Sequence, residues 1–425
     1  MKNPRLILIT NPGSSSRKYA LYREDELLCS LHFEFEGKKV VCTLKKADGT
    51  KKKLDRTFAD LNSTVGALNE ILTDEGYLGG VSKIDAILAR IVATGEYFTE
   101  DHLVDKECLK MLEIAKKRTP LHVPVVANEI EAFVKEFKGT PVIAISDSSF
   151  HAARPDLTEY YAIDKDLADK YEIKRYGAHG LSVGSIVNYM TRENILPEKL
   201  IVCHLGSGSS VTAVFKGQSL DTTMGYTPLE GLMMSTRSGS IDSAAALAIK
   251  RAMKFTDDED LEQYLNKKCG LLGVSGQTDD MREIIRLRDE GDERGTFAHA
   301  MFVYRVQSEI GRMAASLGGV DAIVFTATIG ERSDEIRRSV AQKLGYLGFE
   351  LDNAKNESEL ENRHENIATD GSKPIYVIRT DEFEEMIRRA KVILDADSCE
   401  CGCGCKKGEC DCKDCTCNDS CDCKK

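Results

Sequence analysis

Polar residues with catalytic potential stand at several points of otherwise apolar sequence. Arg90 lies within DAILARIVATG, Asp147 follows the apolar run VIAIS, and His179 lies within RYGAHG. His122 lies in TPLHVP, and Arg237 is the single cation of DTTMGYTPLEGLMMSTRSGSID. Each has a plainer explanation alone, since a lone histidine is usually a core or surface residue and a strand-end aspartate usually a cap. Together they suit phosphoryl transfer, which depends mostly on positioning and charge neutralisation.

Three turns rich in small residues offer groups that could bind phosphate. Gly-Ser-Ser-Ser at 13–16 and Gly-Ser-Gly-Ser-Ser at 206–210 provide unshielded N–H groups and hydroxyls, and Lys18 follows the first. A tight hairpin turn uses the same residue types without a ligand. Neither turn matches a P-loop, and neither opens a helix as a dinucleotide-binding turn does. A third turn at Gly330-Glu331 follows an apolar run, and three such turns favour phosphate binding over coincidence.

The segments that must position these residues alternate between strand and helix patterns, which predicts an α/β fold. Helical periodicity is found at 59–75, 126–137, 241–254, 295–317 and 333–345. Strand patterns are found at 6–10, 19–22, 141–145, 200–204, 211–215, 322–326 and 375–378. We expect the polar stretches near 44–56 and 352–373 to be surface excursions.

An internal repeat is visible when two apolar segments are compared. LILITNPGSSSRKYALY from Leu6 aligns with LIVCHLGSGSSVTAVF from Leu200, and both read strand, small turn, strand. Chance similarity of two such units is the alternative, but a duplicated α/β domain explains the spacing better. Two such domains would face their Gly/Ser turns toward a shared cleft.

Length and composition narrow the class of protein. A chain of 425 residues is too long for one core, and 42% hydrophobic with 30% charged residues excludes a fibrous or wholly disordered protein. The net charge of −11 and the lack of basic patches interleaved with aromatics argue against a nucleic-acid partner. No run approaches a membrane span, and the first apolar run ends too early for a signal peptide. We therefore expect a cytoplasmic protein.

Five long motifs carry a resemblance to a known family: NPGSSSRKYAL, RYGAHG, HLGSGSSV, DTTMGYTPLEGLMMSTRSGSID and DAIVFTATIGERSDEIR. From about residue 6 to 395 the chain resembles the acetate kinase family (acetate/propionate kinases), within the sugar kinase, actin and Hsp70-type ATPase fold. The resemblance implies a duplicated two-domain α/β fold with a cleft between the domains, and a homodimer. The expected domains are 1–148 and 149–381, with a helix at about 382–397 that rejoins the first domain.

The activity that this resemblance implies is reversible transfer of the ATP γ-phosphoryl group to acetate or a similar short-chain acid, giving an acyl phosphate and ADP, with Mg²⁺ as cofactor. One alternative is a kinase for a longer acid such as propionate or butyrate. Another is a non-enzymatic protein that binds nucleotide or metal.

The resemblance also implies roles for individual residues. The catalytic residues would be Arg90, Asp147, His179 and Arg237. The acid would contact Arg90, Val92, Leu121, Ala178 and Pro228, and magnesium would be held near Asn11, Asp147 and Glu382. The nucleotide and its phosphates would contact Asn11, Ser14, Ser16, Lys18, His122, His204, Gly206, Ser207, Gly208, Asp280, Met281, Arg282, Thr328, Gly330 and Arg332.

Some positions depart from the family pattern. Ala178 stands where the family usually has phenylalanine, and Val123, Ser207, Ser240 and Arg332 also replace typical residues. A methyl group in place of a ring predicts extra space beside the acyl chain, unless Tyr176, Leu181 or Met233 fills it.

The last 27 residues differ from the rest of the chain. They hold ten of the fifteen cysteines: Cys399, Cys401, Cys403, Cys405, Cys410, Cys412, Cys415, Cys417, Cys421 and Cys423. With no other apolar residue the tail cannot bury a core, and it resembles a metallothionein-like segment. Closely spaced thiolates would chelate Zn²⁺, Cd²⁺ or Cu⁺, and a metal-free thiol tail is the alternative. The five other cysteines are expected to be small buried residues.

Overall fold

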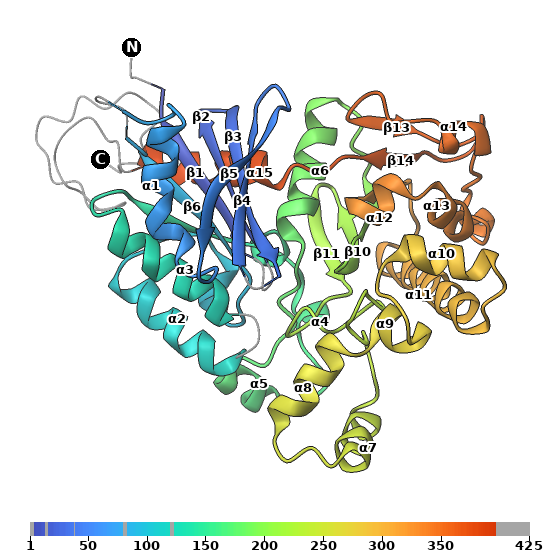
Figure 1. Cartoon of the computed structure of the whole chain (residues 1–425). Coiled ribbons are helices and arrows are strands. Elements are labelled where there is room, and N and C mark those ends of the chain that lie inside the picture. Colours follow the sequence, from blue (N-terminus) through green and yellow to red (C-terminus); the bar gives the residue numbers. More distant parts are fainter. Residues whose placement is uncertain (1–3, 13–15, 38, 80–82, 120–122, 397–425) are drawn as a thin grey trace, which may run out of the picture.

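Two β-sheets lie side by side and form two lobes of the molecule (Figure 1). The computed structural model describes residues 4–12, 16–37, 39–79, 83–119 and 123–396. The first sheet has the order β5-β4-β3-β2-β1-β6-β8-β7, and the second has the order β11-β10-β9-β12-β14-β13. We call the first sheet with its covering helices the first lobe, and the second sheet with its covering helices the second lobe.

The strands of the first sheet are β1 (Leu6–Pro12), β2 (Ser16–Arg23), β3 (Glu26–Glu36), β4 (Lys39–Lys46), β5 (Lys51–Phe58), β6 (Ala86–Ile91), β7 (His102–Leu103) and β8 (Val142–Ser146). Those of the second are β9 (Lys199–Leu205), β10 (Ser209–Phe215), β11 (Gln218–Thr222), β12 (Ala322–Thr326), β13 (His364–Asn366) and β14 (Ile375–Ile378).

Both sheets contain the same five-stranded arrangement. In the first, β3, β2 and β1 pair antiparallel, and β6 and β8 continue parallel to β1. In the second, β11, β10 and β9 pair antiparallel, and β12 and β14 continue parallel to β9. The predicted α/β fold and its internal duplication are therefore confirmed.

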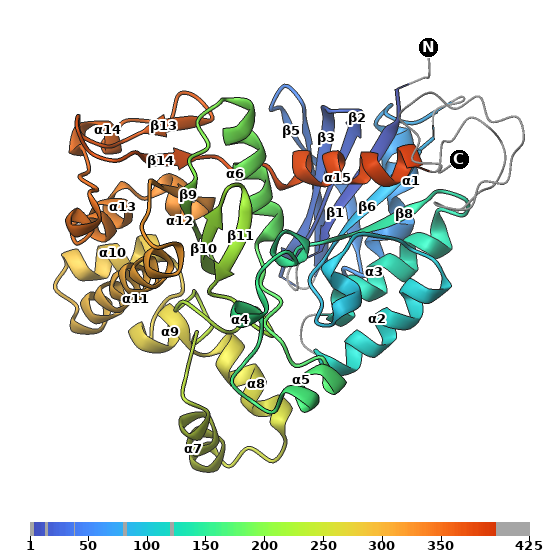
Figure 2. The same cartoon turned by 180° about the vertical axis from the view of Figure 1, so that it is seen from behind.

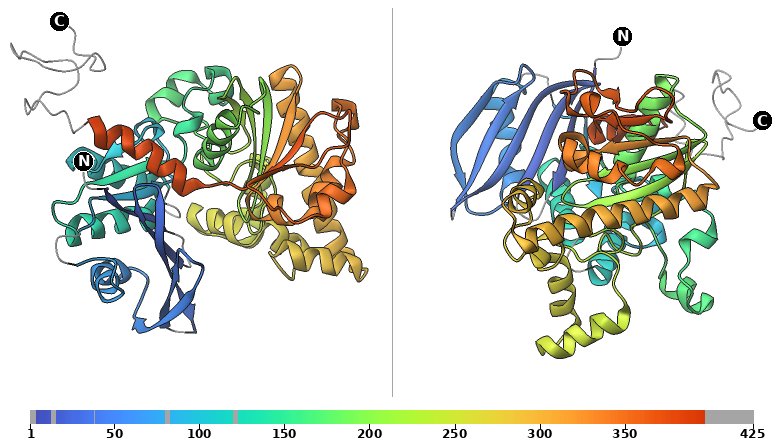
Figure 3. Two further views of the ribbon diagram at one scale, coloured as in Figure 1. Left: turned by 90° about the horizontal axis from the view of Figure 1, so that it is seen from above. Right: turned by 90° about the vertical axis from the view of Figure 1, so that its right-hand side faces the viewer.

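Alternating side chains give each sheet two buried faces. In β1, Leu6 and Leu8 pack toward α1 (Thr64–Asp74), α2 (Lys106–Arg118) and α3 (Val123–Glu136). Ile7 and Ile9 point to the opposite face, because successive strand residues alternate. There they meet Met386, Ile387 and Ala390 of α15 (Glu382–Ala396), the last described helix. Figure 2 shows α15 lying across this face, and Figure 3 shows the chain crossing back from the second lobe to reach it.

The second sheet is covered in the same manner. One face packs on α11 (Glu293–Leu317), with α9 (Gly270–Ser275), α10 (Met281–Asp289) and α13 (Asp334–Ala341) nearby, and the other packs on α6 (Gly180–Arg192). The long helix α11 begins at an Asp292 cap and ends where Gly318 adopts a left-handed φ of 61°. The remaining α-helices are α4 (Asp156–Glu159), α5 (Lys165–Tyr171), α7 (Ser243–Met253), α8 (Asp258–Lys267), α12 (Ala327–Arg332) and α14 (Asn353–Glu357).

Three local predictions were wrong. The stretch 44–56 belongs largely to β4 and β5, whose Leu44 and Leu54 are buried although lysines surround them. The stretch 352–373 contains α14 and β13, with Ile367 and Ala368 buried. The expected turn at Gly330-Glu331 is instead part of α12, which begins directly after β12.

Within the described residues, no helix has the length and apolar character that a membrane crossing needs.

Candidate active site

A cavity of about 730 Å³ lies where strand ends of the two lobes face each other. Because β1, β6 and β8 run parallel, their carboxyl ends meet at one edge of the first sheet, and β9, β12 and β14 do the same in the second. Ligands of open α/β sheets bind at such edges. The lining residues are Asn11, Pro12, Arg90, Val92, Val125, Val126, Asp147, Ala178, His179, His204, Gly206, Ser207, Gly208, Pro228, Thr236, Arg237, Asn266, Lys267, Ala327, Thr328, Glu331, Thr380 and Glu382.

Arg90 and Asp147 form an ion pair at the floor of this cavity. Nη2 of Arg90 lies 2.8 Å from Oδ2 of Asp147, which is fully buried. Asp147 also accepts hydrogen bonds from the backbone N–H groups of His179 (2.9 Å) and Leu181 (3.1 Å). Burial alone would raise the pKa of the Asp147 carboxyl, but the Arg90 guanidinium holds that pKa below its usual range. Asp147 is therefore an anion that orients Arg90 and the His179 backbone.

His179 and His204 are stacked beside this pair. Their ring centroids lie 3.9 Å apart, and each Nδ1 lies 2.8 Å from a serine Oγ, that of Ser210 for His179 and that of Ser182 for His204. Burial lowers the pKa of His204 to about 4, and Arg90 adds to this effect. Burial, His204 and Arg90 hold the pKa of His179 well below its ordinary value. Both rings are therefore neutral hydrogen-bonding groups at physiological pH.

Arg237 approaches the same space from the second lobe. Its Nη1 lies 3.4 Å from the Pro228 carbonyl oxygen, and no carboxylate of the described residues lies within 4 Å of it. Burial and the charge of Arg90 lower its pKa, but an arginine starts from so high a pKa that the guanidinium stays a cation at neutral pH. Because no described carboxylate neutralises it, it can bind an anion. A Cβ on Gly208 would lie 3.2 Å from Nε2 of His179 and 3.4 Å from Nη1 of Arg237. The second Gly/Ser turn therefore faces both side chains.

Oxygen donors suitable for magnesium lie near Arg90. Nη1 of Arg90 is 3.4 Å from Oδ1 of Asn11 and 3.9 Å from Oε2 of Glu382, so these two oxygens converge on one nitrogen. Burial raises the pKa of Glu382, and Arg90 opposes this only in part. Among the described residues, no group of three or more His, Cys, Asp or Glu is arranged to hold a metal ion. A carboxylate and an amide oxygen nevertheless fit Mg²⁺, which usually takes one or two protein ligands beside phosphate oxygens and water.

An apolar corner of the cavity is formed by Val92, Ala178 and Pro228. Ala178 is buried in a cluster with Met224 and Met234. Tyr176, one of the residues that the sequence suggested as a space filler, lies beside Val92 and Pro228. Val92 and Pro228 also line an adjoining cavity of about 10 Å³, close to the size that admits one water molecule. The wall of the main cavity is therefore apolar at this corner, and the space behind it is small.

Not every expected site residue lies at the cavity. Ser16 and Lys18 lie on β2, and Gly330 is inside α12. Asp280 caps α10, Met281 is in the core, and Arg282 is exposed and paired with Asp280. Arg332 lines a neighbouring cavity of about 470 Å³, which shares Glu331 with the first. Ser14, Leu121, His122 and the ten tail cysteines lie outside the described residues.

Several other residues line the cavity although they were not among the expected site residues. The most connected is Glu331, whose Oε1 accepts hydrogen bonds from the N–H groups of Ala327 (2.9 Å) and Thr380 (3.2 Å). It therefore ties α12 to the segment that leads from β14 into α15. Asn266, Lys267, Val125 and Val126 also line the cavity, and the sequence holds no local signal for them. Thr236 lines it too, directly before Arg237 in the motif DTTMGYTPLEGLMMSTRSGSID.

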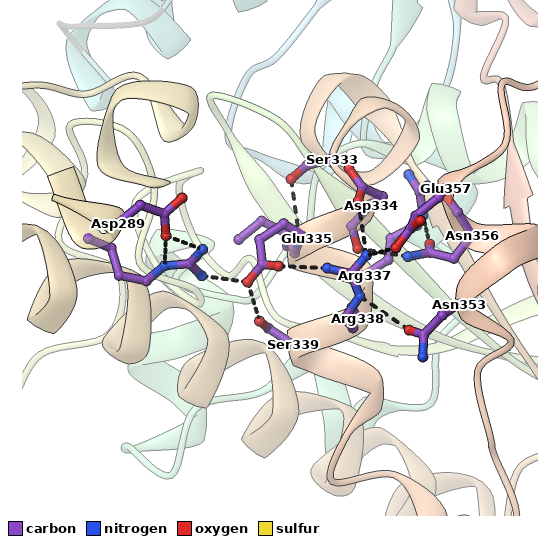
Figure 4. A network of polar contacts seen from close by, with 12 residues as sticks. Asp289, Ser333, Asp334, Glu335, Arg337, Arg338, Ser339, Asn353, Asn356 and Glu357 are labelled. Carbon is purple, nitrogen blue, oxygen red and sulfur yellow. Dashed lines mark hydrogen bonds and ion pairs between the residues drawn. The ribbon is translucent and has the colours of Figure 1, made fainter. Parts of the chain in front are cut away.

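A buried arginine, Arg337, holds the helix α12, and Figure 4 shows this arginine beside Asn356. Arg337 donates from Nη1 to the carbonyl oxygens of Gly330 (3.1 Å) and Glu331 (2.9 Å). Its Nε and Nη2 donate to the side chain and the carbonyl of Asn356, both at 2.7 Å. These contacts fix α12, and with it the part of the cavity wall that Thr328 forms, to the rest of the second lobe.

This fold and site define a class of two-lobed phosphotransferases, and comparison with known proteins agrees. The model of the acetokinase family matches residues 6–389. The acetate kinase of Clostridium novyi is 36% identical over 92% of this chain and 98% of its own, and that of Thermoanaerobacter pseudethanolicus is 38% identical over 90% and 97%. A propionate kinase structure from Francisella tularensis has a TM-score of 0.83 and 33% identity, covering 91% of this chain and 98% of its own.

The chain belongs to the acetokinase family, whose members are phosphotransferases with a carboxyl group as acceptor.

Proposed function

We propose that this enzyme transfers the γ-phosphoryl group of ATP reversibly to acetate or a similar short-chain carboxylate, giving an acyl phosphate and ADP. The observation that carries the proposal is the convergence of Arg90, His179, Arg237 and the turn at Gly208 on one cavity between the lobes. Two cations, a neutral imidazole and backbone N–H groups suit a transferring phosphoryl group, whose charge is spread over its oxygens.

The reaction needs no general base from the protein. A short carboxylic acid has a pKa of about 4, near that of a glutamate side chain, so at neutral pH it is already an anion. One carboxylate oxygen forms a bond to the γ-phosphorus while the bond between that phosphorus and the ADP oxygen breaks. Arg90 and Arg237 reduce the repulsion between the two anions. The Ser210 hydroxyl can donate to Nδ1 of His179, which leaves Nε2–H to donate to a phosphoryl oxygen.

Magnesium is part of the proposal, and Asn11 and Glu382 are the residues that would hold it. When bound with the nucleotide it would neutralise charge on the phosphate oxygens. Asp147 is better suited to orienting Arg90 than to binding the ion directly, because its oxygens already accept three hydrogen bonds.

An activity panel of acids against phosphoryl donors tests this proposal. Acetate, propionate and butyrate should be combined with ATP, GTP and pyrophosphate, with and without Mg²⁺. We expect turnover with a nucleotide and a short acid, and its loss when Mg²⁺ is removed. Absence of turnover in every combination would refute the proposal.

A longer acid is the second candidate, and Ala178 is the residue that favours it. Its methyl group occupies less space beside Val92 and Pro228 than a phenylalanine ring would. Each additional buried CH₂ contributes about 0.8 kcal/mol, roughly a factor of four in kcat/KM. We therefore propose that propionate or butyrate is used at least as well as acetate, with Ala178→Phe restoring the preference for acetate. A steady fall of kcat/KM from acetate to butyrate in the wild-type enzyme would contradict this.

We also propose a cytoplasmic homodimer with a metal-binding tail. The family resemblance supports the dimer, and the free thiols of Cys29, Cys42, Cys108, Cys203 and Cys269 suit a reducing compartment.

Ten tail thiolates could hold roughly two or three Zn²⁺ at four ligands each, with some shared. Native mass spectrometry should detect these ions and their loss on deletion of 399–425, with kinase activity unchanged. A metal-free mass after purification with Zn²⁺ would refute the tail site.

A further inference from the structure

His151 is a buried histidine that the proposed chemistry does not use. It ends a short 3₁₀ helix (Ser149–His151) that follows β8, and only 1% of its surface is exposed. Its Nδ1 lies 2.8 Å from Oγ of Ser219 on β11, and its Nε2 lies 3.2 Å from the carbonyl oxygen of Ala178. The ring therefore bridges β11 and the residue that immediately precedes His179.

The backbone of His179 needs such support because it adopts a left-handed conformation. Its φ of 67° is unfavourable for a residue with a Cβ and costs about 1–3 kcal/mol unless the surroundings fix it. Ser148 Oγ donates to the Gly177 carbonyl oxygen (2.6 Å), and the Gly180 N–H donates to the Asp147 carbonyl oxygen (2.8 Å). Residues 147–151 thus hold residues 177–180 at several successive points.

The two partners of the ring define its protonation. A carbonyl oxygen can only accept, so Nε2 must carry the hydrogen that is shared with Ala178. Nδ1 is then an acceptor, and the Ser219 hydroxyl donates to it. Burial and the nearby charge of Arg154 lower the pKa of His151 to about 3, so this neutral form is kept at physiological pH.

The fit is also tight on the side of the backbone. A Cβ on Gly177 would lie 2.9 Å from Cδ2 and 3.1 Å from Cγ of the His151 ring, and Gly177 itself has a φ of 80°. The chain therefore passes directly against the ring before it reaches His179. A side chain at 151 that is shorter, or that donates from another position, cannot hold the Ala178 carbonyl in the same place.

We infer that His151 is a positioning residue for the reaction: its Nε2–H fixes the Ala178 carbonyl, and through it the strained backbone that aims the His179 imidazole into the cavity. The inference rests on the proposed function, since His179 acts on the phosphoryl group there. It assigns His151 no contact with substrate.

Two amide substitutions separate this role from simple packing. The terminal nitrogen of His151→Gln can reach the Nε2 position, whereas that of His151→Asn reaches only the Nδ1 position. We expect kcat within about threefold of wild type for His151→Gln and a fall of about 10- to 100-fold for His151→Asn, as a small misplacement of a reacting group produces. KM for acid and ATP should change less than about twofold in both. Equal kcat values in His151→Gln and His151→Asn would overturn the inference. So would a loss of activity that appears as a higher KM and leaves kcat unchanged.

A measurement on the wild-type enzyme covers the case in which neither variant folds. Two-bond ¹H–¹⁵N correlation spectra at pH 7 should show His151 as the neutral tautomer protonated at Nε2, and an Nδ1-protonated ring would overturn the assignment. Ser148→Ala, which releases the Gly177 carbonyl and leaves His151 intact, should also lower kcat with KM unchanged. An inactive wild-type enzyme would refute the proposed function and not the tautomer, which the nitrogen spectrum reports separately.

Discussion

Arg90 and Arg237 line the same cavity but differ in what surrounds them. Arg90 is paired with Asp147 and lies near Glu382, so part of its charge is already neutralised. Arg237 contacts the Pro228 carbonyl and the sulfur of Met234, and no described carboxylate is within ion-pair distance. Removal of Arg237 leaves no buried carboxylate without a partner, whereas removal of Arg90 would leave Asp147 unpaired. A substitution of Arg237 therefore tests the effect of positive charge on phosphoryl transfer with less effect on the fold.

Arg237→Ala should therefore lower kcat by about 10²–10³, the usual effect of losing one preorganised charge at such a group. The free energy of unfolding should change by less than about 1 kcal/mol. Steady-state kinetics and urea denaturation measure the two quantities. Arg251→Ala, on the exposed helix α7, is the matched control and should be silent in both assays. More than a tenth of wild-type activity in Arg237→Ala would contradict its role.

Residues in unusual surroundings were the ones that sequence could identify. Arg90, Asp147, His179 and Arg237 are polar groups in apolar or glycine-rich segments, and the structure brings them to one cavity. His151, Asn266 and Thr380 could not be identified in this way, because their importance comes from partners far away in sequence. His151 contacts Ala178 and Ser219, and neither partner leaves a local pattern around position 151.

Secondary-structure elements were predicted best where the hydrophobic period was uninterrupted. The strands β1, β9, β12 and β14 and the helix α11 have clear periods and were expected close to their observed bounds. The strands β4 and β5 were missed because runs of lysine stand beside the single buried leucine of each strand, so the composition resembled that of a loop. Burial of one face of an edge strand depends on the partner helix, which local sequence does not reveal.

The attachment of α12 gives a prediction at the scale of elements. Arg337 is buried and satisfies the carbonyls of Gly330, Glu331 and Asn356, whereas its neighbour Arg338 forms partly exposed ion pairs with Asp334, Glu335 and Glu357 (Figure 4). Arg337→Met removes the donor to three backbone carbonyls and to the side-chain oxygen of Asn356, and should lower the free energy of unfolding by about 2–5 kcal/mol. Arg338→Met, the matched control, should cost less than about 1 kcal/mol.

Urea denaturation compares the two variants, and kinetics adds a second readout. Since α12 lines the cavity beside Thr328, Arg337→Met should raise KM for the nucleotide more than KM for the acid. Equal stability of the two variants would show that the buried contacts do not hold α12 in place.

At the scale of the whole molecule, duplication explains why one cavity receives groups from both lobes. Each sheet ends its parallel strands at the edge that faces the other, and α15 returns the chain to the first sheet after β14. Glu331 binds the N–H of Thr380 at that crossing, beside Glu382. The sequence indicated the duplication through its repeat, but it could not indicate which side chains of the two lobes meet at the cavity.

Buried histidines make the stability of the whole fold depend on pH. The pKa of His151 is lowered to about 3 and that of His204 to about 4, in both cases chiefly by burial, and burial holds that of His179 well below its ordinary value. The unfolded chain binds protons at these positions below about pH 6.5, while the native protein does not. The free energy of unfolding should therefore fall as pH drops from about 7 to 4, by up to about 1.4 kcal/mol per unit for each histidine.

Chemical denaturation at several pH values measures this slope. Burial raises the pKa of Glu129, which contributes in the opposite direction, so a variant is needed to assign the effect. Burial also lowers the pKa of His299, which adds to the same slope. His151→Gln removes one of these buried histidines and should reduce the slope. An identical slope in wild type and variant would contradict the assignment to His151.

Formation of an acyl phosphate from a short acid and ATP tests the central claim most directly. Purified enzyme with ATP, Mg²⁺ and hydroxylamine should convert acetate, propionate or butyrate into the hydroxamate, with one ADP released for each hydroxamate. Arg237→Ala should form it at least about 10²-fold more slowly. Release of ADP with no hydroxamate from any of the three acids would contradict the account, because the phosphoryl group would then have gone to an acceptor other than the carboxylate.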